Sequence, residues 1–300
     1  MLSKDVEALI GKMIRVPAGE YWVGALEDDE DAQDNEKPAH QVKISQDYYI
    51  AAFPVLQPLW TAVTGQELDK AHVWIKPWVG DKYPMFGVHW LDALAFCNQL
   101  SRLLGLEEVY SGLGSYQVGT IFSYQPNDGE VDVEVGEAMC EKVKMNLQAN
   151  GYRLPTEAEW EIAAQGIPAG SGQQRMLYAG SNHPDAVAWH LNNRRAEELK
   201  LAGGKKVVGK LKANGFVLYD MSGNISEWCW DRYSAETYAL RAQSLPSPSK
   251  DPIGIGEGFF RVLRGGSHHS LAEDARVTAR GYTAPLQVNS HVGLRLVRTR

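Results

Sequence analysis

The sequence of 300 residues has few cysteines, no long apolar run and no excess of positive charge. Its three cysteines, Cys97, Cys140 and Cys229, are far apart and odd in number, which argues against a disulfide framework and against a zinc site built on CxxC. A formal net charge of −7 and a pI of about 5.7 argue against a broad nucleic-acid-binding surface. Because no apolar run is long enough to cross a bilayer, we expect no membrane span.

The N-terminal residues 1–13 predict a short amphipathic helix and lack the apolar core of a signal peptide. We therefore expect a cell-surface location if a leader has been removed, and a cytoplasmic one otherwise. Hydrophobic residues make up 44% of the chain, and neither a repeat nor a linker divides it, so we predict one domain over residues 1–300. Nine tryptophans, 13 tyrosines and 29 glycines favour a loop-rich fold pinned by large rings.

Two stretches predict helices most clearly. Apolar residues cover a wide face of residues 90–105, and Gly105 stands where a helix would end. Further along, Thr156 is a ready N-cap, and Glu159 three residues later completes a capping box. The carboxylates of Glu157 and Glu159 would also suit acid–base catalysis, but capping and the helix dipole account for them.

Shorter elements are expected before the first of these helices. Residues 13–24 predict two strands around a Pro-Ala-Gly turn, as in a hairpin, and the alternating residues 40–50 predict one strand. Residues 58–64 predict a short helix. Residues 27–36 are strongly acidic, and we interpret them as a solvated loop, with a cation site as the alternative.

A tryptophan-rich segment, residues 214–233, turns at Gly223, with Asp220 and Glu227 on either side. A tight turn aims carbonyl oxygens and flanking carboxylates at one point, which suits a hard, oxygen-seeking cation. The alternative is a turn that only hydrogen-bonds to itself.

The C-terminal segment, residues 261–300, has two apolar stretches with a long excursion between them. Residues 262–266 predict a strand that ends at a Gly-Gly break, and residues 293–297 predict a second strand. The residues between them follow neither the helical nor the strand period. We therefore predict an irregular loop, held at both ends, that displays its side chains.

Six ordered motifs resemble those of the formylglycine-generating enzyme (sulfatase-modifying factor) family. They are MIRVPAGEYWVG, FGVHWLDALAFCNQLS, NGYRLPTEAEWEIAA, NGFVLYDMSGNISEWCWD, RVLRGGS and GLRLVR, and they span nearly the whole chain. The resemblance implies an α+β, C-type-lectin-like fold with little regular secondary structure. It also implies that the two ends of the chain meet in a small antiparallel sheet.

The resemblance also implies where this chain departs from active members of the family. Those members use two cysteines shortly after the RGGS motif to hold copper, whereas residues 267–280 here contain none. Because soft thiolates select Cu(I), we expect no copper and no oxidase activity. The family also has a calcium site, which would use the side chains of Asp220 and Glu227 with the carbonyls of Gly223 and Ile225. Ser226 stands where the family usually has tryptophan.

Within the family, the chain looks most like the variable proteins of diversity-generating retroelements. In these proteins a reverse transcriptase rewrites the C-terminal segment, whose varied side chains bind a ligand. The resemblance implies a ligand surface made of eleven residues: His268, His269, Ser270, Leu271, Gly281, Tyr282, Thr283, Val288, Asn289, Ser290 and His291. The interleaved Arg276, Ala279, Arg280, Pro285, Arg295 and Leu296 would be the fixed framework.

The leading hypothesis is therefore a non-catalytic binding protein, a monomer, whose diversified segment recognises a protein or a surface glycan. Two alternatives stay open. One is a metal-dependent oxidase that uses His268, His269 or His291. The other is a cysteine-less regulatory paralogue of an active enzyme. The framework arginines would, in the plainest interpretation, only neutralise carboxylates within the scaffold.

Overall fold

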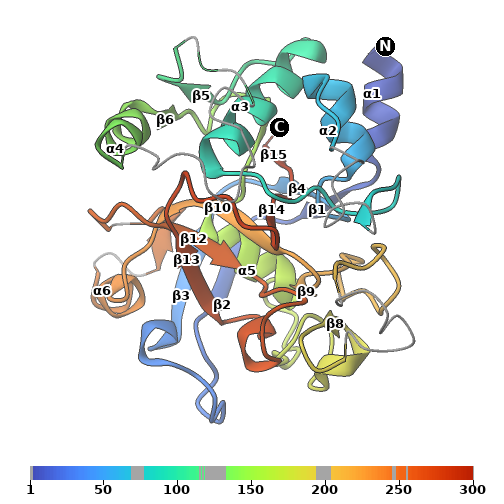
Figure 1. Cartoon of the computed structure of the whole chain (residues 1–300). Helices are drawn as coiled ribbons and strands as arrows, with labels where there is room; N and C mark the ends of the chain where they lie inside the picture. Colours follow the sequence, from blue (N-terminus) through green and yellow to red (C-terminus); the bar gives the residue numbers. More distant parts are fainter. Residues whose placement is uncertain are drawn as a thin grey trace.

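A computed structural model describes residues 3–68, 78–114, 116, 118, 133–193, 204–244, 248–254 and 256–299, without the side chains of 133–137. The helices, shown in Figure 1, are α1 (Ser3–Ile10), η1 (Asp34–Glu36), α2 (Gln57–Thr64), α3 (Trp90–Leu103), α4 (Val133–Lys142), α5 (Glu157–Gln165), η3 (Pro184–Ala186), α6 (Thr237–Gln243) and η4 (Glu273–Ala275). The strands are β1 (Met13–Val16), β2 (Gly19–Val23), β3 (His40–Ile44), β4 (Tyr48–Ala51), β5 (Tyr110–Ser111), β6 (Lys144–Met145), β7 (Tyr152–Arg153), β8 (Ala188–Trp189), β9 (Ser222–Gly223), β10 (Ser226–Arg232), β11 (Ser249–Lys250), β12 (Arg261–Arg264), β13 (Arg280–Thr283), β14 (Val292–Gly293) and β15 (Val297–Thr299). The α+β fold class is confirmed.

The helices begin and end where the sequence predicts. Helix α5 opens with the predicted capping box: the Glu159 amide donates to the Thr156 hydroxyl at 3.2 Å, and the Thr156 amide donates to the Glu159 carboxylate at 2.9 Å. Helix α3 ends just before Gly105, which has a φ of 68° that only glycine adopts readily. In the described parts of the chain, no helix combines the length and the apolar character that crossing a membrane requires.

The two ends of the chain meet in one sheet, as the resemblance implies. Its strand order is β1-β4-β15-β7, and β15 pairs antiparallel with both β4 and β7. Figure 1 shows α1, α2 and α3 gathered beside this sheet, on the side where both termini lie. The predicted hairpin of residues 13–24 is wrong, because β1 pairs with β4 whereas β2 pairs with β3 in another sheet.

A second four-stranded sheet, of order β13-β12-β10-β14, carries the C-terminal segment. Strand β13, residues 280–283, lies within the excursion that the sequence predicts to be irregular, and it pairs antiparallel with β12. The single strand predicted at residues 293–297 is two strands, β14 and β15, which belong to different sheets. The excursion is therefore attached to the fold by a strand in its middle as well as at its ends.

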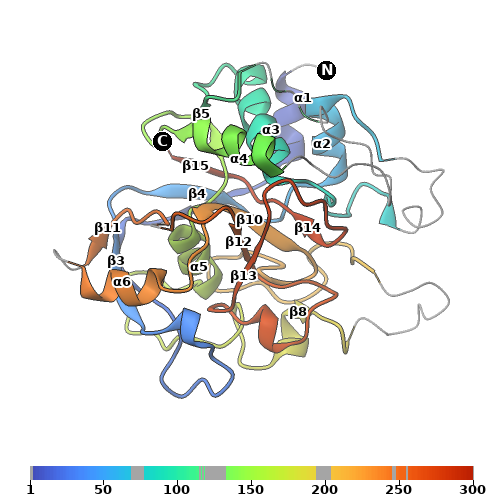
Figure 2. The same ribbon diagram turned by 60° about the vertical axis from the view of Figure 1, so that its left-hand side comes forward.

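Every residue of helix α5 is buried. The helix packs behind the second sheet, against β10 and β12, as Figures 1 and 2 show. The fully buried indole of Trp160 donates from Nε1 to the Glu227 carboxylate of β10 at 2.7 Å. The same carboxylate accepts from Arg295 at 2.8 and 3.0 Å. Arg295 also donates to the carbonyls of Ala51 and Tyr219, each at 2.8 Å. This guanidinium therefore ties both sheets together.

We expect Arg295→Ala to lower the free energy of unfolding by about 3–5 kcal/mol, because it leaves the Glu227 carboxylate buried without its cation. Arg102→Ala is the matched control. Its ion pair with Glu108 leaves the side chains 59% and 35% exposed, so the loss should stay below about 1 kcal/mol. Urea denaturation of the two variants measures both values. Equal losses would contradict the role given to Arg295.

Candidate ligand-binding surface

The first group of predicted surface residues lies in a tight turn whose shape depends on Ser267, on Asp274 and on one of the predicted residues, Ser270, whose hydroxyl accepts from the Ser267 amide at 3.1 Å. The Ser267 hydroxyl accepts from the amide of His269 at 3.1 Å, and the Ser267 carbonyl accepts from the amide of Ser270 at 3.0 Å. The Asp274 carboxylate accepts from the amide of Leu271 at 3.2 Å. Because these bonds use the backbone of the turn, the exposed side chains of His269 and Leu271 do not set its shape.

His268 is not part of the surface, and its assignment as a ligand-binding residue is corrected. Its side chain is only 1% exposed, and its Nδ1 lies 2.7 Å from the carbonyl oxygen of Asn224. Burial lowers the pKa of His268 to about 3, so the ring is neutral at physiological pH. The ring fills the space behind the turn at Asn224, and the surface begins at His269.

The second group, Gly281, Tyr282 and Thr283, lies on β13 at the edge of the sheet. Gly281 and Tyr282 are exposed and Thr283 is half-buried. The ring of Tyr282, 50% exposed, stacks on Tyr233 with the ring centroids 4.1 Å apart and lies 5.2 Å from the ring of Phe260. The side chain of Tyr282 therefore has one supported face and remains accessible to a ligand.

The third group, Val288, Asn289, Ser290 and His291, is half-buried and follows a firm anchor. The carbonyl of Pro285 accepts from the amide of Trp90 at the start of α3, at 2.7 Å. The ring centroid of His291 lies 5.7 Å from that of His269. Residues that are 22 positions apart in the chain (291 minus 269) are thus neighbours on the surface.

A cavity of about 190 Å³ joins the first group to the second. Ser270 lines one side of it, and Gly281 and Tyr282 line the other. Ser226 of β10 also lines it, at the position where the resemblance implies a tryptophan in the family. Ten of the eleven predicted residues, all except His268, are exposed or half-buried. Three of them, Ser270, Gly281 and Tyr282, line this cavity, and the third group adjoins the first through the rings of His291 and His269.

The interleaved arginines are buried framework residues, as predicted. Arg276 donates to Asp29 at 2.6 Å and to both carboxylate oxygens of Glu36 at 2.7 and 2.8 Å. Arg280 donates to both carboxylate oxygens of Glu157, at 2.7 and 2.9 Å. Burial alone would raise the pKa of Glu157 and Glu36, but the guanidiniums hold each pKa below its ordinary value.

Sequence reasoning missed two members of this framework, Asp29 and Glu36. They belong to the acidic residues 27–36, which we interpreted as a solvated loop, yet both side chains are buried on Arg276. The only signal in the sequence was the excess of acidic residues, which does not say which of them face inward. The remaining acidic residues of this stretch, Glu27, Asp28, Glu30, Asp31 and Asp34, are exposed, in agreement with the prediction.

The predicted calcium ligands do not fit an ion as they lie in the structure. Both oxygens of Glu227 are held by Arg295 and Trp160. The Asp220 carboxylate accepts from the amide of Gly209 at 2.8 Å and from the Asn224 side chain at 3.2 Å. The carbonyl of Gly223 accepts from the amide of Ile225 at 2.8 Å. This arrangement agrees with the alternative, a turn that hydrogen-bonds to itself.

Histidines near the surface do not form a metal centre in the structure. Among the described residues, no group of three or more His, Cys, Asp or Glu side chains is placed to hold a metal ion. The His268 and His269 rings lie edge to face at 4.5 Å, and His268 directs Nδ1 to a carbonyl. None of the three cysteines forms a disulfide bond and all three are buried, so no thiol reaches the surface.

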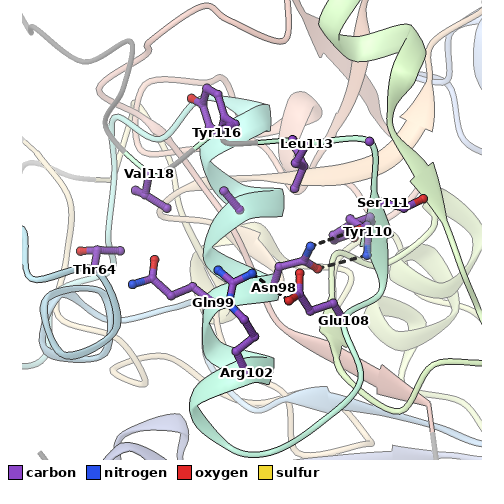
Figure 3. A pocket seen from close by; sticks show the side chains of 13 residues that line it. Thr64, Asn98, Gln99, Arg102, Glu108, Tyr110, Ser111, Leu113, Tyr116 and Val118 are labelled. Atoms are coloured by element: carbon purple, nitrogen blue, oxygen red, sulfur yellow. Dashed lines mark hydrogen bonds and ion pairs between the residues drawn. The ribbon is translucent and has the colours of Figure 1, made fainter.

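A larger cavity, of about 470 Å³, lies on the other side of α3 and is shown in Figure 3. Asn98 exchanges two hydrogen bonds with the backbone of Tyr110, at 2.7 and 3.1 Å. Arg102 donates to Glu108 at 2.8 Å. These polar groups of the cavity therefore bond to one another. None of the predicted surface residues lines this cavity.

An irregular α+β fold with paired termini and an exposed, arginine-anchored C-terminal segment is that of the formylglycine-generating enzyme class. The chain belongs to the family described as the sulfatase-modifying factor enzyme 1-like domain, which it matches over residues 2–300. It is 32% identical over 267 residues to the chaperone protein LppX of Paenibacillus barcinonensis, covering 85% of this chain and 81% of that protein. It is 27% identical over 297 residues to the formylglycine-generating enzyme of Thermomonospora curvata, covering 94% and 92%.

Solved structures show the same fold. Treponema denticola variable protein 1 has a TM-score of 0.71 and 29% identity, covering 96% of this chain and 95% of that one. PvdO from Pseudomonas aeruginosa, at 19% identity and a TM-score of 0.63, covers 96% and 94% and shows the fold alone. These likenesses confirm the resemblance to the family and to its variable proteins. Some relatives are much longer, since the chain spans 38% of the serine/threonine-protein kinase pkn1 of Chlamydia pneumoniae, at 28% identity.

We expect His268 to make stability depend on pH. Its folded-state pKa of about 3 lies below the ordinary value of 6.5, so the unfolded chain binds the proton more readily between these values. The contribution of His268 is fully present above pH 6.5 and is lost as pH falls toward 3. His268→Gln should therefore flatten the pH dependence of the unfolding free energy in this window, as urea titrations would measure. An unchanged slope would contradict the burial of this ring.

Calcium should leave the thermal unfolding temperature unchanged within about 1 °C, because the Glu227 carboxylate already holds Arg295 and a ligand that does not bind the folded state cannot stabilise it. Scanning calorimetry with excess EDTA and then with millimolar CaCl₂ gives the measurement. A rise that disappears in Asp220→Asn would show that Arg295 gives way to calcium and would restore the predicted site.

Proposed function

We propose that this chain is a non-catalytic ligand-binding protein whose C-terminal segment is diversified by a retroelement to recognise macromolecular targets. It acts as a single domain and as a monomer in this proposal. The target is another macromolecule, a protein or a surface glycan. The likeness to Treponema denticola variable protein 1 over nearly the whole of both chains supports this reading.

The observation that carries the proposal is the alternation of exposed and buried residues along the segment. The ten surface residues, from His269 to His291, reach solvent, while Arg276, Arg280 and Arg295 between them are buried in ion pairs. Changes at exposed positions usually alter stability by less than about 0.5 kcal/mol. Removing one partner of a buried ion pair costs about 3–5 kcal/mol. Such a segment tolerates substitution at the ten surface positions but not at the buried arginines.

Gly281 illustrates this tolerance. A Cβ atom at this position would lie 3.3 Å from the carbonyl oxygen of Leu263 and 3.5 Å from its Cβ. A larger side chain therefore needs only a small adjustment, and it would project from the edge strand toward the cavity that Gly281 lines.

We expect the combined variant Leu271→Ser, Gly281→Ser and Asn289→Ala to remain folded, with a loss below about 0.5 kcal/mol per site. Arg276→Ala leaves two buried carboxylates without their cation and should lower the free energy of unfolding by about 3–5 kcal/mol. Urea denaturation followed by circular dichroism compares them. Comparable losses in the two proteins would mean that the surface residues support the fold, and the proposal would fail.

Diversification itself is tested at the gene. A near-identical template repeat and a reverse-transcriptase gene should lie near it, and alleles from one organism should differ at the ten surface positions. A complete locus with neither feature would rule out the retroelement. The competing oxidase hypothesis requires stoichiometric copper or iron in the purified protein, and elemental analysis that found either metal would favour it.

A further inference from the structure

The cavity between Ser270 and Tyr282 has an aromatic wall that is held in place from behind. Tyr282 stacks on Tyr233 with an angle of 23° between the rings, and the guanidinium of Arg280 lies 5.1 Å from the centre of the Tyr233 ring. Phe260, 44% exposed, lies against the ring of Tyr282 but does not line the cavity. The exposed face of a tyrosine ring attracts a cation through its quadrupole. Tyr233 and Phe260 thus support the ring of Tyr282, which is the one of these three aromatic side chains that lines the cavity.

Positive charge within this cavity is already neutralised. Arg276 and Arg280 both line it, but their guanidiniums are buried against Asp29, Glu36 and Glu157. Neither is therefore available to bind an anionic group such as a phosphate or a sialic acid carboxylate. Further N–H groups of these guanidiniums donate to the carbonyls of Asp31, Asn35 and Ser234.

The charges that remain accessible at the cavity are negative. Glu273 and Asp274 of η4 line it and are exposed, and neither forms an ion pair with a described residue. Asp274 uses one carboxylate oxygen, Oδ2, to accept from the amide of Leu271. Both residues are exposed, so the Oδ1 atom of Asp274 and the carboxylate of Glu273 are accessible to a ligand cation.

A second acidic segment borders the same cavity. Gln33 and Glu36 line it, and the exposed carboxylates of the loop that carries them lie at Glu27, Asp28, Glu30, Asp31 and Asp34. Arg276 holds this loop against the C-terminal segment through Asp29 and Glu36. Acidic surfaces of this kind steer cationic partners toward them and repel anionic ones.

We infer, on the basis of the proposed function, that the target is a protein that places an arginine or lysine side chain in this cavity. The cation would lie between the ring of Tyr282 and the carboxylates of Glu273 and Asp274. One ligand group can contact both the aromatic ring and the carboxylates only if it is a cation with an apolar stem. Arginine and lysine side chains have both properties. A neutral glycan would leave both carboxylates without a partner.

A phage-displayed library of random peptides, selected against the whole chain, tests this inference. Selected peptides should be enriched in arginine or lysine, and replacing that residue by glutamine should weaken binding at least about tenfold. The double variant Glu273→Gln, Asp274→Asn should weaken binding to a similar degree, and so should Tyr282→Ala. Asparagine at position 274 still offers an oxygen to the amide of Leu271, so the turn is kept.

The matched control is Asp81→Asn with Glu107→Gln, which removes the same net charge from exposed positions that do not line the cavity. It should bind selected peptides as the unchanged chain does. Peptides that depend on Tyr282 but contain no cationic residue would overturn the inference and leave the binding function intact. A selection in which no binder depends on Tyr282, Leu271 or Asn289 would contradict both.

Discussion

Buried arginines of the C-terminal segment determine how the rest of this structure is arranged. Four of them are paired with carboxylates from outside the segment: Arg264 with Glu161, Arg276 with Asp29 and Glu36, Arg280 with Glu157, and Arg295 with Glu227. Arg261, which is also buried, instead donates to the carbonyl of Trp230 and lies over the ring of Trp90. A charge without a partner in a buried position is far more costly than a lost contact between apolar groups. Because each arginine has one set of partners, a shift of the segment by a single residue would leave several charges unpaired.

This constraint separates the residues that hold the segment from those that it presents. The pairs of Arg276 and Arg280 fix the backbone on either side of Thr278, where Val277 and Ala279 are also buried, so the exposed positions that follow at 281 and 282 need not contribute to the core. The turn after Ser267 follows the same principle, because Ser267 and Asp274 bond to its backbone amides. The energetic contrast between these two kinds of position explains why a rigid fold and a changeable surface can occupy the same stretch of chain.

The sequence predicted the elements whose causes are local. The capping box at Thr156 and the helix that ends before Gly105 are both present. The sheet that joins the termini, which only the resemblance to the family implied, is present as well. It did not predict features that depend on distant partners. The pair of Arg280 with Glu157 spans 123 positions, and nothing near Glu157 distinguishes its pairing role from a capping role. His268 has the same limitation, because its burial depends on Asn224, 44 positions away.

Tyr282 lies on a regular strand and is nevertheless exposed together with its neighbour Gly281. In a β-strand, successive side chains point to opposite faces of the sheet. Strand β12 is covered on both faces, so all four of its residues are buried. The excursion that contains residues 281–283 follows neither the helical nor the strand period, and it was therefore predicted to be an irregular loop. Strand β13 is at the edge of its sheet, where it has a neighbour on one side only, and both of its faces can reach solvent. An edge strand thus presents consecutive side chains with the fixed backbone that a binding surface needs, since less conformational freedom is lost when a target binds.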